Sequence, residues 1–261
     1  MAQQKRQVHL EWIRRNVRQH SMKVLLKTDL FEEANGEDEL LFSLPFEADL
    51  KLGIDIDETT VRRASLRRPG ACKRFIAADV RHLPFEAGSV DTIISNSTLD
   101  HFDSAGDLEI SIRELARVLK PGGRLLITLD NPRNPLYLLF RAGARRYGLT
   151  FRLGHTAGRR ELARLFADAG LEIVSSDLLL HNPRFLSTLL FLALRRLRLG
   201  DRAIGALLSA FSFLGKLPTR EYTAVFVAAC GRKPDHDAQC ASASSRDEAT
   251  AAECGSRSAV R

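Results

Sequence analysis

Short apolar runs separated by amphipathic stretches dominate the first 130 residues of this chain. The runs lie at 23–29, 50–56, 74–79 and 89–95, and each has the length of a buried strand. Strands that alternate with helices are typical of a parallel sheet with helices on both faces. The pattern therefore predicts an α/β fold built on a doubly wound sheet.

Amphipathic stretches lie between and after these runs, with apolar residues at helical spacing. Asp57 begins one of them as a cap, and we expect Thr156 to cap another. Pro121, Gly122 and Gly123 form the predicted turn into the fifth strand. The predicted helices are 8–17, 37–44, 57–64, 108–119 and 158–169, and the later strands are 124–129, 171–176 and 221–230.

Carboxylates stand where the second and third strands end, at Asp55 and Asp79. In parallel sheets, ligands bind outside the carboxyl ends of the strands. Asp55 suits the two hydroxyls of a ribose, because a carboxylate accepts several hydrogen bonds. Asp79 suits the exocyclic amine of adenine, with the Val80 amide as a donor beside it. Each aspartate alone is equally well explained as a solvated cap, but together they favour a nucleoside pocket.

Four segments carry a resemblance to a known family: 53–57, 78–85, 89–91 and 119–125. Here the chain resembles class I S-adenosylmethionine-dependent methyltransferases, of the methyltransferase type 11 branch that includes quinone-biosynthesis enzymes. The similarity runs from about Lys23 to Pro234. It implies a Rossmann-like, seven-stranded and mostly parallel sheet. It also implies an antiparallel last strand at the sheet edge, after a helical insertion.

The same resemblance implies S-adenosyl-L-methionine as the cofactor. Residues at the ends of three strands match the family's cofactor-binding positions. The residues implied to contact the cofactor are Asp55, Ile56, Asp79, Val80, Asn96 and Ser97.

The turn after the first strand departs from the family pattern of an acid followed by alternating glycines. Bare backbone there lets the methionine part approach closely, whereas this chain offers only Gly36. In one explanation, Thr28 and Asp29 hydrogen-bond the amino-acid end of the cofactor, and Asp29 pairs with its ammonium group. In the other, cofactor binding has been lost and the fold persists as a scaffold. Retention of Asp55 and Asp79 favours the first explanation.

We expect one domain with additions at both ends. The predicted parts are an N-terminal helix at 1–22, the methyltransferase domain at 23–232 and a tail at 233–261. The tail is expected to be disordered, because it has little to bury. An insertion at 133–156 follows the fifth strand and is the predicted cover of the acceptor.

A second insertion, at 183–217, is the most apolar part of the chain. Its runs at 185–194 and 203–214 are separated by arginines, and neither reaches the roughly 20 residues of a membrane span. One interpretation is a helical pair packed over the acceptor pocket. The other is a peripheral membrane contact through 185–214. Both imply a small-molecule or lipid-like acceptor.

Composition and charge bear on the size of the core, the kinds of partner and the location of the protein. A chain of 261 residues with 44% hydrophobic residues can bury one sizeable core, and its four cysteines lack the spacing of a metal site. Its net charge of +7 would attract nucleic acid, anionic lipid or acidic substrates, but aromatic residues do not interleave with the basic ones, which disfavours nucleic acid. The N-terminus lacks an apolar signal core, so we expect a cytoplasmic protein, with peripheral membrane association as an extension.

Methyl transfer is an in-line displacement at a sulfonium, and hydroxyl or acidic carbon acceptors also need a base. The candidates are Asp100, His101, His155 and His181. His101 is the best placed, because it follows the fourth strand, although a satisfied loop histidine, or one stacked near the cofactor, is the simpler explanation.

We therefore expect an S-adenosylmethionine-dependent methyltransferase that acts on a small or lipid-like molecule. The alternative is a catalytically inactive methyltransferase-fold scaffold or binding protein. A dehydrogenase is disfavoured, because the glycine fingerprint of dinucleotide binding is missing. The fold cannot name the acceptor atom.

Overall fold

The computed structural model describes the greater part of the chain. The described residues are 2–17, 21–36, 39–44, 46–70, 72–135, 137, 154–181, 196, 211 and 213–235. Three predicted features lie wholly or largely outside them: the acceptor cover at 133–156, the apolar runs within 185–214 and the tail beyond 235. No described helix is long and apolar enough to cross a membrane.

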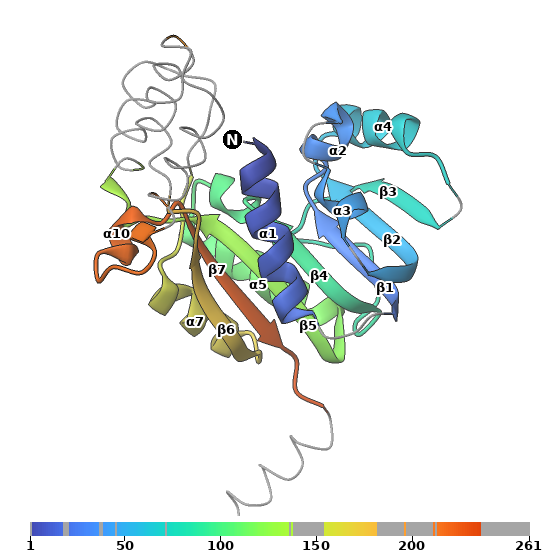
Figure 1. The fold of residues 1–261 in the computed structure, drawn as a ribbon. Coiled ribbons are helices and arrows are strands. Elements are labelled where there is room, and N and C mark those ends of the chain that lie inside the picture. Colours follow the sequence, from blue (N-terminus) through green and yellow to red (C-terminus); the bar gives the residue numbers. More distant parts are fainter. Residues whose placement is uncertain are drawn as a thin grey trace, which may run out of the picture.

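A seven-stranded sheet forms the centre of the molecule (Figure 1). Its order is β3-β2-β1-β4-β5-β7-β6, in which β1 to β5 pair in parallel and β7 pairs antiparallel to both β5 and β6. The predicted fold class is confirmed. The strands are β1 Ser21–Thr28, β2 Glu47–Asp55, β3 Lys73–Ala77, β4 Val90–Asn96, β5 Leu119–Asp130, β6 Glu172–Leu179 and β7 Phe226–Arg232.

The place of the last strand was predicted wrongly. β7 lies between β5 and β6, so β6 forms the sheet edge. Its residues from Phe226 to Gly231 are all buried, as expected of a central strand covered on both faces. The strand also begins later than predicted, because Arg220–Thr223 forms the short helix α10.

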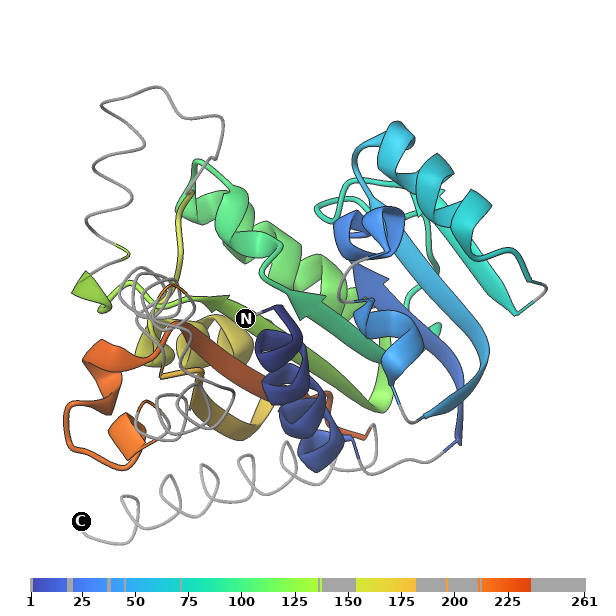
Figure 2. The ribbon, with the colours of Figure 1, turned by 45° about the horizontal axis from the view of Figure 1, so that its top comes forward.

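Two apolar cores lie on opposite faces of the sheet. Leu108, Ile112 and Leu115 of α5 pack on one face, together with Leu162 and Phe166 of α7. α1 and α3 pack on the other face (Figures 1 and 2). The helices are α1 Ala2–Asn16, α2 Phe31–Asn35, α3 Leu40–Ser43, α4 Glu58–Arg67, α5 Ala105–Val118, α7 Arg159–Asp168 and α10, with the 3-10 turn η1 at Leu99–His101.

Several local predictions need correction. The crossover helix predicted at 37–44 is replaced by α2 and α3, because Gly36 ends α2 in a left-handed conformation with φ of 75°. The predicted turn at Pro121–Gly123 lies inside β5, and a Cβ on Gly123 would come within 2.9 Å of the Asp91 carbonyl oxygen. Thr156 does not cap α7, since its hydroxyl bonds the Asp130 carbonyl oxygen. The N-cap predicted at Asp57 is confirmed by bonds from two backbone amides of α4.

Candidate cofactor site at the carboxyl edge of the sheet

The order in which strands are added to the sheet reverses between the parallel strands β1 and β4. From β1 the chain continues to β2 and β3 on one side, whereas β4 leads to β5 on the other. Strand ends meet at this edge, because Thr28 is paired with Ser95 of β4 and with Ile54 of β2. In doubly wound sheets such a switch point is where ligands bind. The predicted site residues of β1, β2 and β4 are therefore brought to one edge.

A buried ion pair holds the turn after β1. Lys27 and Glu33 of α2 are both fully buried, and the Lys27 Nζ donates to Glu33 Oε2 at 2.7 Å. Nζ also donates to the Asp29 carbonyl oxygen at 2.7 Å, and Glu33 Oε1 accepts from the Leu41 amide at 3.0 Å. Burial opposes the charge of Lys27, but the carboxylates of Glu33, Asp29 and Glu32 outweigh it and raise the pKa of the ammonium.

Thr28 and Asp29 have different environments in this turn. The buried Thr28 Oγ1 lies 2.9 Å from Ser95 Oγ and 3.0 Å from Thr98 Oγ1, so its hydroxyl joins β1 to β4. Asp29 is partly exposed and has a left-handed backbone with φ of 70°. Its Oδ1 accepts from the Phe31 amide at 2.7 Å. Burial raises the pKa of the Asp29 carboxyl, although the Lys27 ammonium opposes this.

Leu30 fills the space between the turn and β2. It is fully buried, and a Cβ built on Gly53 would lie 2.4 Å from Leu30 Cδ2. The absence of a side chain at Gly53 therefore leaves the space that Leu30 occupies. An apolar side chain lies here beside the turn that is glycine-rich in the resembled family.

Asp55 lies at the end of β2 as predicted, and backbone amides fix its carboxylate. Oδ2 accepts from the Leu30 amide at 2.9 Å, and Oδ1 accepts from the Asp57 amide at 2.9 Å. Each oxygen retains a second lone pair for another donor. The next side chain, Ile56, is 70% exposed and offers an apolar surface beside the carboxylate.

Arg81 binds the Asp79 carboxylate through both its guanidinium and its backbone amide. Its guanidinium donates Nη2 to Asp79 Oδ2 at 2.6 Å and Nε to Oδ1 at 3.0 Å, and its amide donates to Oδ1 at 2.9 Å. Arg81 also bonds Asp107 at 2.8 Å and lies 5.4 Å from the Phe102 ring centroid. These hydrogen bonds from Arg81 hold the pKa of Asp79 below its usual value. Val80, beside them, is buried.

Asn96 and Ser97 end β4 beside Thr28. The Asn96 Oδ1 accepts from Thr128 Oγ1 at 2.7 Å, which ties β4 to β5. Ser97 has a left-handed backbone with φ of 51°, and its amide donates to the Thr128 carbonyl oxygen. Its Oγ is a buried atom with no hydrogen-bond partner among the described residues. A ligand hydroxyl or amine would satisfy it.

Asp100 and His101 follow on η1. Asp100 is buried and accepts from the Asp130 amide at 2.7 Å through Oδ2. Its Oδ1 lies 3.9 Å from His101 Nε2, and the His101 side chain is half exposed. Burial raises the pKa of Asp100, opposed by the nearby charges of His101 and Lys5.

Two other candidate bases lie apart from each other. His155 follows Gly154, which packs against the His101–Phe102 backbone so closely that a Cβ would lie 2.2 Å from the Phe102 oxygen. The His155 Nε2 is 3.5 Å from Glu161 Oε1. His181 lies beside α10, with Nδ1 3.0 Å from Thr223 Oγ1, and burial lowers its pKa.

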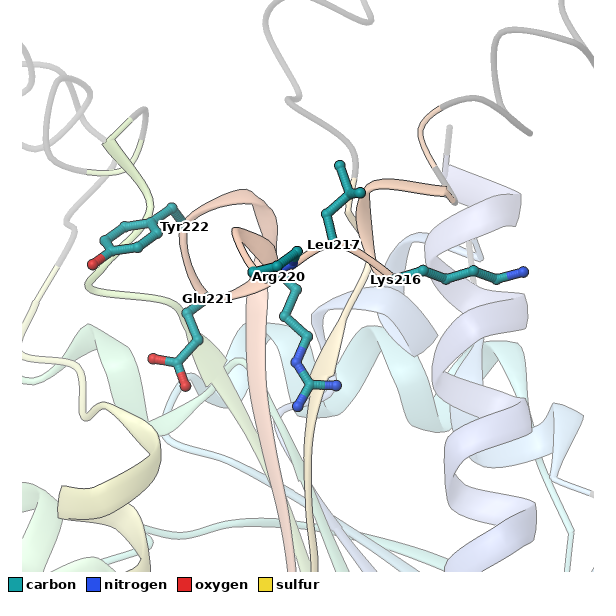
Figure 3. Close-up of a pocket in the computed structure, with 6 residues that line it drawn as sticks. Lys216, Leu217, Arg220, Glu221 and Tyr222 are labelled. Atoms are coloured by element: carbon teal, nitrogen blue, oxygen red, sulfur yellow. The ribbon is translucent and has the colours of Figure 1, made fainter.

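An open hollow of about 550 Å³ lies around α10 (Figure 3). Its lining side chains point in different directions: Arg220 and Glu221 extend to one side of the segment, whereas Leu217 extends to the other (Figure 3). Glu221 also bonds Arg133 and lies 3.8 Å from Arg159. This hollow adjoins the β5–β7 end of the same sheet edge, because Asp130 is paired with Phe226.

Sequence reasoning missed the residues that depend on contacts between distant segments. A lysine at the end of an apolar strand, Lys27, could have indicated a buried ion pair such as the one with Glu33. Arg81 lies two residues after Asp79, and this spacing could have indicated that the two side chains pair. Nothing in the sequence indicated that Lys5 of α1 would reach Glu32, although their Nζ and Oε1 atoms lie 3.1 Å apart.

The residues present fit an adenosine group well and an amino-acid group in part. Asp55, Ile56 and the unpartnered Ser97 hydroxyl supply acceptor, apolar surface and hydroxyl at neighbouring strand ends. At the β1 end, Thr28 is already hydrogen-bonded to its neighbours. Asp29 is the remaining polar side chain of the predicted pair.

Comparison with known proteins agrees with this fold. Residues 41–127 match a family model described as a methyltransferase domain, so the match begins after β1 and its turn and ends within β5. No curated protein matches the sequence.

Solved structures of the same fold cover most of the chain. The complex of the Haloferax volcanii Trm112 methyltransferase activator with a methyltransferase matches at 14% identity, with a TM-score of 0.58 and coverage of 90% of this chain and 93% of that chain. Geranyl diphosphate C-methyltransferase from Streptomyces coelicolor matches at 19%, with a TM-score of 0.57 and coverage of 87% and 79%. N-methyltransferase NodS from Bradyrhizobium japonicum, in complex with S-adenosyl-L-homocysteine, matches at 16%, with a TM-score of 0.54 and coverage of 88% of each chain.

At these identities the likeness shows the fold. The sheet order, the antiparallel β7 and the matched domain agree with one another. Residues 41–127 therefore match a methyltransferase domain, and the chain as a whole has the fold of S-adenosylmethionine-dependent methyltransferases.

Proposed function

We propose that this protein transfers a methyl group from S-adenosyl-L-methionine to a small-molecule or lipid-like acceptor. One observation carries the proposal: at the switch-point edge, two backbone amides orient the Asp55 carboxylate beside the exposed Ile56. A carboxylate oriented in advance binds hydroxyl groups without losing further side-chain freedom.

In this proposal each strand end binds one part of the donor. Asp55 accepts hydrogen bonds from the ribose hydroxyls, and Ile56 packs against the adenine. The Val80 amide and Asp79 lie at the outer edge of the base, although Arg81 already takes much of the Asp79 carboxylate. The donor supplies a methyl group on a positively charged sulfur.

The amino-acid end of the donor lies between β1 and β4. Asp29 pairs with its ammonium group, and Asn96 and Ser97 line the same space. Thr28 contributes indirectly, because its hydroxyl holds β1 and β4 together.

His101 is the proposed proton acceptor when the acceptor group must lose a proton. It is half exposed, and Asp100 lies 3.9 Å behind it. An ionised Asp100 would stabilise the imidazolium that forms when His101 takes the proton. Replacing His101 by Gln is expected to reduce the turnover and leave donor binding unchanged.

The acceptor side lies toward β5, β7 and α10. Phe213 and Tyr222 are large exposed side chains near this end, which suits an apolar acceptor. The geranyl diphosphate C-methyltransferase is one protein of this fold with a lipid-like substrate in its name. Deletion of 185–214 followed by liposome flotation tests the peripheral membrane contact, because only such a contact makes flotation depend on that segment.

Calorimetry with S-adenosylmethionine tests donor binding. Asp55→Ala is expected to weaken the affinity by roughly 10- to 100-fold, since charge-assisted hydrogen bonds contribute about 1.5–3 kcal/mol. Asp168→Ala on α7 is the matched control, because it removes an exposed carboxylate elsewhere. An Asp55→Ala protein with unchanged affinity contradicts the placement of the ribose.

A second function, binding without catalysis, is favoured by the β1 turn. Leu30 fills the space beside Gly53, and the matched family segment begins only after this turn. Such a scaffold would bind a partner through 185–214. If the intact protein has no affinity for S-adenosylmethionine at millimolar concentration, the scaffold explanation replaces the enzymatic one.

A further inference from the structure

We propose that Lys5 of helix α1 binds the carboxylate at the amino-acid end of the donor. The proposal rests on the proposed function and adds a residue to the same site. It is carried by the position of Lys5, by the charges around the β1 turn and by the contacts that fix α1.

The position of Lys5 follows from a small cavity at the switch point. Lys5, Arg6 and His9 line it from α1, Glu32 and Leu40 line it from α2 and α3, and Asn96 lines it from the end of β4. The cavity has a volume of about 10 Å³, close to the space of one water molecule. Because Asn96 lines the same cavity, the cations of α1 lie beside the end of β4, which the proposed function assigns to the amino-acid end of the donor.

Charge makes a cation necessary at this place. The rebuilt turn and its helix contribute the carboxylates of Asp29, Glu32 and Glu33, and Asp55 lies next to them. The only lysine of the turn is Lys27, which is buried and bound to Glu33 and the Asp29 carbonyl oxygen. A ligand carboxylate would be repelled by these side chains, and the cations of α1 that line the cavity, Lys5 and Arg6, offset that repulsion.

Contacts along α1 fix Lys5 over the edge. The His9 Nδ1 lies 2.8 Å from the Lys5 carbonyl oxygen, and the His9 ring packs edge-on to Phe226 with centroids 5.0 Å apart. Further along, the Trp12 indole donates to Asp177 Oδ2 at 2.9 Å. The Lys5 Nζ itself lies 5.9 Å from the Phe226 ring centroid. Helix α1 is thus anchored on β6 and β7 and directs its first turns toward α2.

Glu32 is the present partner of Lys5 and would share it with a ligand. The Lys5 Nζ donates to Glu32 Oε1 at 3.1 Å, and both side chains keep some exposure, 27% for Lys5 and 18% for Glu32. An ammonium has three donors, so Lys5 can bind a second carboxylate. Glu32 therefore lowers the affinity of the site for a carboxylate ligand.

The test compares two ligands that differ in one group. S-adenosylhomocysteine carries the carboxylate, and its decarboxylated amine keeps the adenosine and the ammonium group. Calorimetry on the full chain with Lys5→Gln is expected to show about tenfold weaker binding of S-adenosylhomocysteine and less than about twofold change for the amine. The control Arg15→Gln removes a charge from the exposed end of the same helix and should change neither affinity.

Glu32→Gln provides a second variant with the opposite sign. Removal of the competing carboxylate is expected to strengthen binding of S-adenosylhomocysteine by about two- to fivefold, again without effect on the amine. Equal losses of affinity for both ligands in Lys5→Gln would overturn the role of Lys5. They would indicate that α1 packs over the site without contacting the ligand carboxylate. Failure of the unaltered protein to bind either ligand would overturn the donor site as well.

Discussion

The ends of β1 and β2 lie side by side at one edge of the sheet, yet they are built in different ways. At β2, Asp55 is held by the amides of its own strand end and of the neighbouring turn, and α4 begins with a capped first turn. At β1, a buried lysine, a buried glutamate and a leucine replace the glycine-rich turn. One strand end follows the family pattern, and its neighbour does not.

This difference teaches that two neighbouring strand ends of one sheet can change separately. The end of β2 depends on a single carboxylate and short backbone bonds, which a few residues specify. The end of β1 depends on how α2, α3 and α1 pack around the turn. Because Leu30 links the two ends through Gly53 and Asp55, alteration of one can be measured at the other.

Among the changes at these two strand ends, removal of Lys27 should cause the largest loss of stability. Lys27→Met leaves the buried Glu33 carboxylate without its cation, and breaking such a pair costs about 3–5 kcal/mol. Urea unfolding of the variant is expected to show a loss of that order in the free energy of unfolding.

The double variant Lys27→Met with Glu33→Leu is the control for Lys27. It removes both charges and should recover most of the lost stability, because apolar replacement of a buried pair is often close to neutral. A single variant as stable as the unaltered protein would show that Lys27 and Glu33 do not hold the turn.

An intermediate effect is expected where the two strand ends touch. A methyl group at Gly53 would overlap Leu30 at 2.4 Å and Phe75 at 2.8 Å, so Gly53→Ala should cost about 1–3 kcal/mol of stability. Thermal unfolding measures this loss. The matched control is Gly158→Ala, where φ is also not left-handed and a Cβ meets only Pro132 Cγ at 3.8 Å, so it reports the substitution without overlap.

In the double variant Gly53→Ala with Leu30→Ala, the overlap with Leu30 disappears and only the overlap with Phe75 remains. If Leu30 is the residue that excludes a side chain at position 53, the two losses will be less than additive. Strict additivity would mean that the overlap is relieved elsewhere.

The smallest expected effects on stability concern two aspartates whose pKa values are shifted in opposite directions. The pKa of Asp79 is lowered by Arg81, so its contribution to stability is present above the ordinary pKa and is lost as pH falls through the lowered one. The pKa of Asp100 is raised by burial, so its penalty appears as pH rises from the ordinary pKa through the raised one. Asp79→Asn should reduce stability at neutral pH, and Asp100→Asn should preserve or increase it.

Unfolding free energies measured from pH 3 to pH 7 check these signs. For Asp79 the change is expected to be at most about 1 kcal/mol, because solvent screens a partly exposed pair. Parallel pH curves for the two variants and the unaltered protein would contradict both assignments.

Much of the parallel half of the fold was predictable because its signals are local. Apolar runs of strand length, the acid at the end of β2 and the cap at Asp57 each depend on a few neighbouring residues. The α/β class and the antiparallel last strand followed from the resemblance and from the alternation of strands and helices. Asp55 was therefore brought to the predicted edge.

The rest depended on contacts between distant residues. The pairing of Lys27 with Glu33 belongs to a helix, α2, that was not predicted, and only Leu40–Ser43 of the predicted crossover helix at 37–44 is helical. The bond from Thr156 to the Asp130 carbonyl oxygen removed the predicted cap of α7. The resemblance implied an edge position for the last strand, whereas the buried run of β7 is typical of an interior strand.

The central position of β7 also bears on synthesis of the protein. Until residues 226–232 leave the ribosome, β5 has an unpaired edge and β6 has no neighbour to join. The nascent chain thus carries an open, apolar strand edge from the synthesis of β5 until the synthesis of β7. The last seven residues of the sheet close it, so a chain cut just before Phe226 should aggregate although every other strand is present.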